Sequence, residues 1–237
     1  KPDWVQVTEY NLEPGNDDFV ERVHDVHGPL IRRVRSCFEA LRPVAPERQR
    51  GRTDGHSLDL DRVIEARIAQ RAGVPGPDGL YQRHLPNRRD VAVAFLIDMS
   101  SSTNEVVNQD GKRVMEVEQE ALVLAAEAVD ALGDACAIWG YSGYGRDDVA
   151  FYVAKDFSDP WDRRVRSRVG RIGWKMENRD GAAIRHATAK LLRQPSRVHL
   201  LMLLSDGKPL DCGCDHYVDT YAQEDTRMAL REAHRAG

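Results

Sequence analysis

The sequence has no hydrophobic run long enough to cross a membrane as a helix. Such a span requires about 20 consecutive apolar residues. The longest apolar runs, Val91–Ile97 and Val198–Leu204, have the length of buried strands. No signal peptide is visible, and the chain begins with Lys1, which leaves an upstream signal or span open. We therefore expect no membrane span within this chain.

The chain also has few cysteines and no excess of positive charge. Four cysteines in 237 residues are far fewer than a disulfide-stabilised scaffold carries, which favours a reducing, cytoplasmic location. Lysine and arginine together number 34 against 38 aspartate and glutamate residues, so the formal net charge is -4. Because nucleic-acid binding usually requires a basic excess, we expect no nucleic-acid partner.

Two signatures of catalysis are absent. The glycine-rich Gly140–Gly145 segment is not followed by the Gly-Lys-Ser/Thr of a phosphate-binding loop, so it predicts a hairpin turn. No Gly-x-Ser-x-Gly nucleophile elbow occurs, which makes the serines after Asp98 poor candidates for a hydrolase. We therefore expect a binding protein and not an enzyme.

The first part of the chain, residues 1–88, is predicted to be a mainly helical segment with a linker. Apolar residues at helical spacing predict helices over Phe19–Leu41 and Leu58–Arg71. The polar, arginine-rich Glu47–His56 stretch between them is predicted to be an exposed loop. Gly73–Gly79, with two prolines, is predicted to be the linker.

The second part, residues 89–237, alternates strand and helix patterns. That order is typical of a doubly wound, mostly parallel α/β sheet of the Rossmann type. The C-terminal part of such a sheet is expected to be missing, because the sequence stops after a single helix beyond the last strand. The expected strands are Val91–Ile97, Ala135–Tyr141, Val149–Ala154 and Val198–Leu204, and the expected helices are Val114–Leu132, Trp161–Val169, Ala182–Leu192 and Thr220–His234.

Two of the predicted strands end in oxygen-rich loops. One is followed by an Asp-x-Ser-x-Ser pattern, the other by Ser-Asp-Gly. Ligands of open α/β sheets bind at the carboxyl ends of strands, and Mg²⁺ or Mn²⁺ prefers oxygen ligands such as carboxylates, hydroxyls and water. The predicted metal ligands are Asp98, Ser100, Ser102 and Asp206. The simpler alternative is that these residues only cap the next helix and form an ordinary turn.

These features resemble the von Willebrand factor A fold and its metal-ion-dependent adhesion site. That family has the same Asp-x-Ser-x-Ser and Asp-Gly strand ends, and a third loop supplies a threonine ahead of a Gly-x-Ala-Ile helix. Here Gly181–Ile184 matches the helix, and Asn178 stands at the threonine position. The resemblance implies that the Asn178 amide oxygen replaces the hydroxyl, with Asp180 or Glu177 as a substitute ligand.

Longer motifs resemble the NorD/CbbO group, whose members partner MoxR-type AAA+ ATPases. The matching segments are Arg89–Val93, Gly181–His186, Leu203–Pro209 and Glu224–Arg227. The resemblance implies an adaptor that links a hexameric ATPase to a client enzyme, nitric oxide reductase for NorD-type members or Rubisco for CbbO-type members. A metal held by neutral hydroxyls and few carboxylates keeps an open position, which an acidic side chain of the client would occupy.

One further cluster lies in the Asp211–His216 loop. Cys212 and Cys214 are soft ligands of the kind that bind zinc, but Cys-x-Cys is not the usual spacing of a zinc site. An accessory surface loop with free or redox-active thiols is therefore favoured. Two other functions stay open: a metal-dependent hydrolase that uses the same acidic strand ends, and an extracellular adhesion module.

Overall fold

The computed structural model describes residues 4–15, 18–40, 47–85, 90–106, 111–213 and 216–237. The chain forms two compact units. One, which we call the sheet unit, combines Lys1–Ala40 with Asp90–Gly237; the other, the small unit, is Leu41–Arg89. The first forty residues thus pack with the sheet, and not with the rest of the 1–88 segment.

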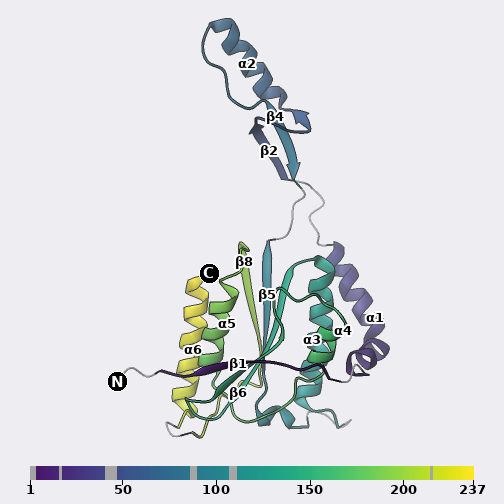
Figure 1. Cartoon of the computed structure of the whole chain (residues 1–237), viewed down its shortest axis with the longest axis vertical. Helices are drawn as coiled ribbons and strands as arrows, with labels where there is room; N and C mark the ends of the chain where they lie inside the picture. Colours follow the sequence, from purple (N-terminus) through teal and green to yellow (C-terminus); the bar gives the residue numbers. More distant parts are fainter. Residues whose placement is uncertain (1–3, 16–17, 41–46, 86–89, 107–110, 214–215) are drawn as a thin grey trace. The chain divides into compact units, whose positions relative to one another are not determined.

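A five-stranded sheet forms the centre of the sheet unit (Figure 1). Its strand order is β1-β7-β6-β5-β8, and every neighbouring pair is parallel except β6 and β7, which form an antiparallel hairpin. The predicted α/β class with a mostly parallel sheet is confirmed. The strands are β1 (Val7–Asn11), β5 (Val91–Asp98), β6 (Ala135–Gly143), β7 (Val149–Lys155) and β8 (Val198–Leu204).

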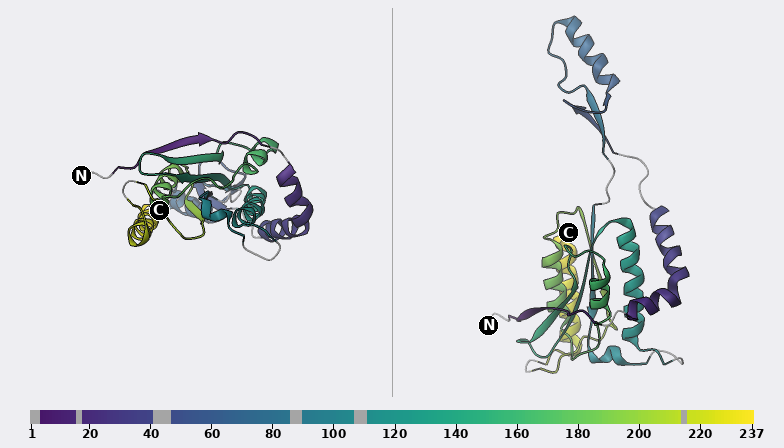
Figure 2. Two further views of the ribbon diagram at one scale, coloured as in Figure 1. Left: turned by 90° about the horizontal axis from the view of Figure 1, so that it is seen from below. Right: turned by 45° about the vertical axis from the view of Figure 1, so that its right-hand side comes forward.

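Helices cover both faces of this sheet (Figures 1 and 2). Alternate side chains of β5 point to opposite faces of the sheet, and both faces are buried. Val93 and the next odd-numbered residues pack in one core with α1, α3 and α4. Ala92 and the next even-numbered residues pack in the other core with α5 and α6. No helix in the described part of the chain is long and apolar enough to cross a membrane. The helices of this unit are α1 (Asp18–Ala40), α3 (Val114–Leu132), α4 (Arg163–Val169), α5 (Asp180–Leu191) and α6 (Asp219–Ala236).

The small unit is a three-stranded antiparallel sheet with one helix. Its strand order is β2-β4-β3, and α2 lies between β3 and β4 in the sequence. Helix α2 buries no residue, and its Leu60, Ile64 and Ile68 are exposed. The elements are β2 (Glu47–Arg52), β3 (Ser57–Leu58), α2 (Leu60–Ala72) and β4 (Tyr81–Leu85).

The prediction of a mainly helical N-terminal segment was wrong in part. Both predicted helices are present as α1 and α2, but four strands, β1 to β4, also lie in this segment. The loop expected at Glu47–His56 is mostly strand β2. The reason is that β1 and β2 are short edge strands with polar side chains: they are held by backbone pairing, so they lack the apolar alternation that identifies a strand.

Candidate functional site

The carboxyl end of β5 lies next to the carboxyl end of β8. The two strands are parallel, and Ile97 pairs with Leu204, so the residues that follow each strand emerge at the same edge of the sheet. On the other side of β5, Asp98 pairs with Tyr141 of β6. Gly140 leaves room for the buried Met99, because an added Cβ would lie 2.3 Å from its sulfur. The register therefore places the two predicted oxygen-rich loops side by side.

The first loop brings three predicted ligands together. Asp98 is fully buried, and its Oδ1 accepts a hydrogen bond of 2.8 Å from the Ser100 backbone N–H. The hydroxyl oxygens of Ser100 and Ser102 lie 2.9 Å apart. Ser100 precedes a short 3₁₀ helix (Ser101–Asn104), yet its side chain makes no capping hydrogen bond. The Ser100 hydroxyl is thus directed to Ser102 and not to the helix end, which speaks against the simple capping alternative.

The second loop contributes Ser205 and Asp206. The Ser205 hydroxyl donates a hydrogen bond of 3.2 Å to Asp98 Oδ2, which joins the two loops. Asp206 accepts a hydrogen bond of 3.0 Å from the Lys208 backbone N–H, as in an ordinary Asx turn. Asp206 is also close enough for its charge to act on Asp98. The geometry of this loop is therefore compatible both with a metal ligand at Asp206 and with an ordinary turn.

Asn178 contacts the site through its amide nitrogen. Nδ2 donates a hydrogen bond of 2.5 Å to Asp98 Oδ2, and Oδ1 accepts one of 2.7 Å from the Leu210 backbone N–H. Because a backbone N–H can only donate, that second bond fixes the orientation of the amide. The oxygen expected to act as a ligand therefore points away from Asp98. Asn178 reaches the site, but as a donor to its carboxylate.

Asp180 is buried beside the same cluster. Its Oδ1 accepts a hydrogen bond of 2.8 Å from the Tyr141 hydroxyl. Burial, and then the charges of Asp98 and Asp206, raise the pKa of Asp180 to about 6. The pKa of Asp98 is also raised, by burial first and by Asp206 in addition, although hydrogen bonds from Ser100 and Asn178 oppose the shift.

A further carboxylate, Glu118 of α3, was not predicted. Burial and the charges of Asp98 and Asp206 raise the pKa of Glu118 to about 7, and its buried Oε2 has no hydrogen-bond partner among the described residues. The sequence does hold a signal for it: Glu118 lies three residues after Met115 and four before Leu122, on the buried stripe of the helix. An acidic residue on an apolar stripe indicates a functional or paired carboxylate. Four carboxyl groups therefore gather at this edge.

Metal ligation itself stays a prediction. In the part of the chain that the structure describes, no group of three or more His, Cys, Asp and Glu side chains has the arrangement of a metal site. The four predicted ligands are not such a group, since two of them are the serines Ser100 and Ser102. Of the thiol loop, Cys212 is exposed and Cys214 lies outside the described residues, so that prediction is also untested.

A buried ion pair anchors the loops around the site. Asp211 is fully buried and pairs with Arg179 Nε; it also accepts hydrogen bonds from the Gly145 backbone N–H at 2.9 Å and the Gly213 backbone N–H at 2.8 Å. Three loops are thereby tied together. The sequence singled out the loop that begins at Asp211 but did not pair Asp211 with Arg179, because the two residues are 32 positions apart and no motif joins them.

Comparison with known proteins gives several relatives named NorD and one uncharacterized protein. No protein-family model matches the chain. It is 43% identical over 208 residues to Protein NorD of Brucella suis, covering 88% of this chain and 32% of that protein. It is 36% identical over 211 residues to Protein NorD of Stutzerimonas stutzeri, covering 88% and 34%. An uncharacterized protein of Pseudomonas aeruginosa is 39% identical over 204 residues, with coverages of 86% and 33%.

Solved structures are more distant. The PilB minor pilin from Streptococcus sanguinis aligns with 58% of this chain and 35% of its own, at 14% identity and a TM-score of 0.43. That likeness is too weak to assign the fold. The chain spans about a third of the length of the curated relatives it matches. Over most of its own length, the sequence similarity to proteins named NorD supports a NorD-like family for this chain.

Proposed function

We propose that this chain is the client-binding part of a NorD-type adaptor that couples a MoxR-type AAA+ ATPase to nitric oxide reductase. One observation carries the proposal: Asp98, Ser100 and Ser102 converge at the strand edge where the Asp206 loop also ends. The relatives named NorD favour nitric oxide reductase over Rubisco as the client. The chain is proposed to be non-enzymatic, with ATP hydrolysis performed by the partner.

The donor set fits a divalent cation. Only oxygen atoms are offered, from carboxylates and hydroxyls, which is the preference of Mg²⁺ and Mn²⁺. Asp98, Asp180 and Glu118 all have raised pKa values, first because each is buried and then because each is affected by the negative charge of Asp206. The buried Glu118 Oε2 lacks a hydrogen-bond partner within the described ranges. A cation bound between the Asp98 and Asp206 loops would reduce the repulsion that these carboxylates feel.

Each residue then has a distinct role. Asp98 and the hydroxyls of Ser100 and Ser102 would hold the cation, with Asp206 approaching from the second loop. Asn178 orients Asp98 through its amide hydrogen bond and is not assigned as a ligand. Asp180 accepts a hydrogen bond from the Tyr141 hydroxyl and would contribute negative charge near the cation without binding it. A cation held mainly by neutral hydroxyls keeps net positive charge, so it supplies an open position for a carboxylate of the client.

The proposal is tested by capture with purified components. The tagged parent protein is incubated with nitric oxide reductase and the MoxR-type ATPase, in Mg²⁺ or in chelator. We expect the reductase to be retained only with Mg²⁺ and to be lost in Asp98→Ala. The matched control is Asp90→Ala, because Asp90 is exposed at the opposite end of the same strand. Retention that ignores both chelator and Asp98→Ala would contradict the metal-bridged adaptor.

A metal-dependent hydrolase is the second candidate. The observation in its favour is Glu118, whose pKa of about 7 suits a general base near neutral pH. It predicts Mg²⁺-dependent release of p-nitrophenol from p-nitrophenyl phosphate by the purified chain, and loss of that turnover in Glu118→Gln. A preparation without turnover eliminates this candidate and leaves the adaptor untouched.

A further inference from the structure

The described residues of the small unit form no apolar core. The side chains that are buried there are both polar, Asp59 at 1% and Gln82 at 8% exposure. A unit of this size that buries no large apolar side chain gains little free energy from hydrophobic burial, so a contact outside the unit is expected. The exposed large apolar side chains are Leu58, Leu60, Ile64, Ile68, Val74 and Tyr81.

Three of these side chains form a ridge along α2. Leu60, Ile64 and Ile68 are spaced four residues apart, so they lie one above the other on one side of the helix. They are 69%, 58% and 62% exposed. Ridges with this spacing pack into the grooves of another helix, in the commonest arrangement of packed helices in globular proteins. The exposed ridge therefore favours a helix as its partner.

Two arginines lie beside this ridge. Arg67 and Arg71 each follow an isoleucine of the ridge by three positions, which places them on the same side of α2, and both are exposed. Arg67 donates a hydrogen bond of 2.6 Å to the neutral side chain of Gln70. Arg71 has no ion-pair partner among the described residues. This flank of the ridge is thus open to carboxylates, which guanidinium groups bind with two parallel hydrogen bonds.

The small unit as a whole is basic, whereas the rest of the chain is acidic. Residues 41–89 contain ten arginines, no lysine and six acidic residues, a formal net charge of +4 with histidine neutral. The rest of the chain contains 24 basic and 32 acidic residues, a net charge of -8. The second flank of the ridge carries Asp61 and Glu65, but Asp61 is paired with Arg50 at 3.0 Å. Charge complementarity therefore favours an acidic partner.

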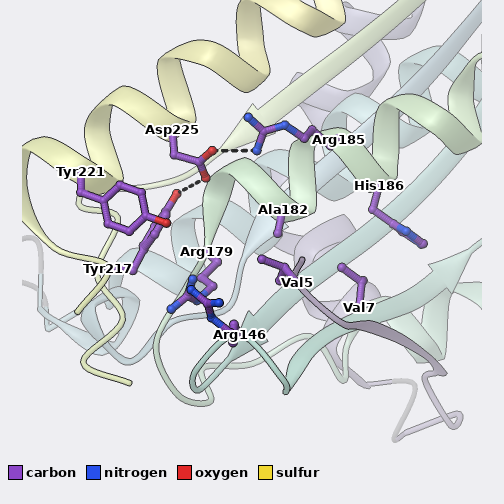
Figure 3. Close-up of a pocket in the computed structure, with 10 residues that line it drawn as sticks. All are labelled: Val5, Val7, Arg146, Arg179, Ala182, Arg185, His186, Tyr217, Tyr221 and Asp225. Carbon is purple, nitrogen blue, oxygen red and sulfur yellow. Dashed lines mark hydrogen bonds and ion pairs between the residues drawn. The ribbon is translucent and has the colours of Figure 1, made fainter. Parts of the chain in front are cut away.

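A cavity in the sheet unit shows the contrast. It has a volume of about 470 Å³ and is lined by residues of α5, α6 and the start of β1 (Figure 3). Around it, Asp225 accepts a hydrogen bond of 2.8 Å from Arg185 and one of 2.9 Å from the Tyr217 hydroxyl. Arg179 of the same lining is buried in its ion pair with Asp211. These charges are used within the fold, unlike that of the exposed α2 arginine.

We propose that the α2 face, defined as Leu60, Ile64, Arg67, Ile68 and Arg71, docks a second protein through a helix that carries an apolar ridge flanked by carboxylates. A protein is favoured over nucleic acid because the centre of the face is apolar. The predicted metal site belongs to the other unit, so client and second protein are bound by different units. That the second protein is the ATPase rests on the proposed function.

The test measures binding of the purified MoxR-type ATPase to the full-length parent protein by biolayer interferometry. Ile64→Ala combined with Ile68→Ala should weaken binding by roughly tenfold or more, because the centre of the contact loses its apolar groups. Arg71→Glu should weaken it by roughly tenfold and reduce its dependence on NaCl. Met228→Ala and Arg231→Glu on α6 are the matched controls, because both side chains are exposed in the sheet unit.

Hydrogen exchange of the α2 amides provides the second measurement. The α2 variants replace exposed side chains, so the exchange of the free variants should match that of the free parent protein. Protection that appears on addition of the ATPase supports the proposal. Protection already present in the free parent protein would mean that the face is covered within the protein, and would overturn it. Equal ATPase affinity in the parent and both α2 variants would overturn it as well, as would a parent protein that does not bind the ATPase.

Two further arms separate this inference from its alternatives. The Ile64→Ala, Ile68→Ala variant should keep Mg²⁺-dependent capture of the reductase, while Asp98→Ala should lose that capture and keep its affinity for the ATPase. Failure of the metal site and failure of the α2 face are therefore read independently. A short DNA duplex is added as a competitor: displacement of the ATPase at an affinity equal to its own would reveal a nucleic-acid surface and overturn the protein assignment.

Discussion

Helices α5 and α2 are of nearly equal length but are held in opposite ways. Helix α5, in the sheet unit, buries six residues, including Ile184 at 0% exposure, against the central sheet. Helix α2, in the small unit, buries none. Most helical stability in proteins comes from packing of an apolar face and not from intrinsic propensity. The candidate site therefore lies on the unit whose helix packs against a buried sheet, while the small unit is held by backbone pairing between its strands.

The largest expected effect comes from removing Asp211, whose buried ion pair with Arg179 holds the loops of the sheet unit together. Asp211→Ala removes the partner of the buried Arg179 and should lower the free energy of unfolding by about 3–5 kcal/mol. Asp61→Ala in the small unit removes an exposed pair with Arg50 and should cost about 0–1 kcal/mol. Urea unfolding followed by tryptophan fluorescence reports the first, because all four tryptophans lie in the sheet unit. Hydrogen exchange of the α2 amides reports the second.

Asp211→Asn is the conservative control, since it keeps the shape of the side chain and one acceptor oxygen. It should lose less stability than Asp211→Ala. Equally small losses of unfolding free energy in Asp211→Ala and Asp61→Ala would mean that the buried ion pair of the sheet unit stabilises no more than the exposed pair of the small unit.

Truncating one isoleucine in each helix tests the packing argument directly. Ile184→Ala in α5 should lower the free energy of unfolding by about 2–5 kcal/mol, because it leaves a cavity in a fully buried position. Ile64→Ala in α2, where the side chain is 58% exposed, should change it by less than about 0.5 kcal/mol. The same fluorescence and hydrogen-exchange readings apply. A large loss at Ile64 would indicate that α2 is covered in solution.

The acidic cluster gives the sheet unit a pH dependence of its own. The pKa of Glu118 is raised from 4.5 to about 7. Between these values the folded state keeps a proton that the unfolded state has lost, so the free energy of unfolding falls as the pH rises. Glu118→Gln removes this fall and should stabilise the protein at pH 8 relative to pH 5. After a discount for the partly exposed side chain, the expected difference is about 1 kcal/mol.

The measurement is urea unfolding of both proteins at the two pH values, with Glu65→Gln on the exposed helix α2 as the matched control. A destabilised Glu118→Gln at pH 8 would contradict the assigned repulsion. Addition of Mg²⁺ provides a second reading, since a cation bound at the cluster should remove much of the pH dependence of the parent protein.

The smallest difference between the two units is expected at the glycines that end their helices. Gly73 ends α2 at φ 69° and Gly133 ends α3 at φ 72°, and neither has an atom within 4 Å of an added Cβ. Replacing either by alanine should cost about 1 kcal/mol, because the left-handed backbone is strained for any residue with a Cβ. Unequal losses, measured by hydrogen exchange within each helix, would show that burial contributes even at these exposed ends.

Much of the sheet unit could be predicted because its signals are local. Val91–Asp98 and Val198–Leu204 are apolar runs, and both are strands. The expectation of a buried strand holds only for the first, because β8 lies at the edge of the sheet and Val198, Leu200 and Met202 are exposed. The polar ends of both runs predicted the two loops of the candidate site. Strands β1 and β2 carry no such signal, because their side chains are mostly polar and backbone hydrogen bonds, which side-chain patterns do not record, hold them in the sheets.

The oxygen-bearing residues that follow β5 and β8 can be identified from the sequence, because strand formation depends on neighbours along the chain. The contacts that these residues make depend on the tertiary structure. The Leu210 backbone N–H bonds the Asn178 oxygen, so the Asn178 amide nitrogen faces Asp98. Glu118 on helix α3 lies close enough to Asp98 and Asp206 for their charges to raise its pKa. Asp211 forms a buried ion pair with Arg179. Each of these depends on packing between segments far apart in the chain, where contact is set by the fold and not by spacing in the sequence.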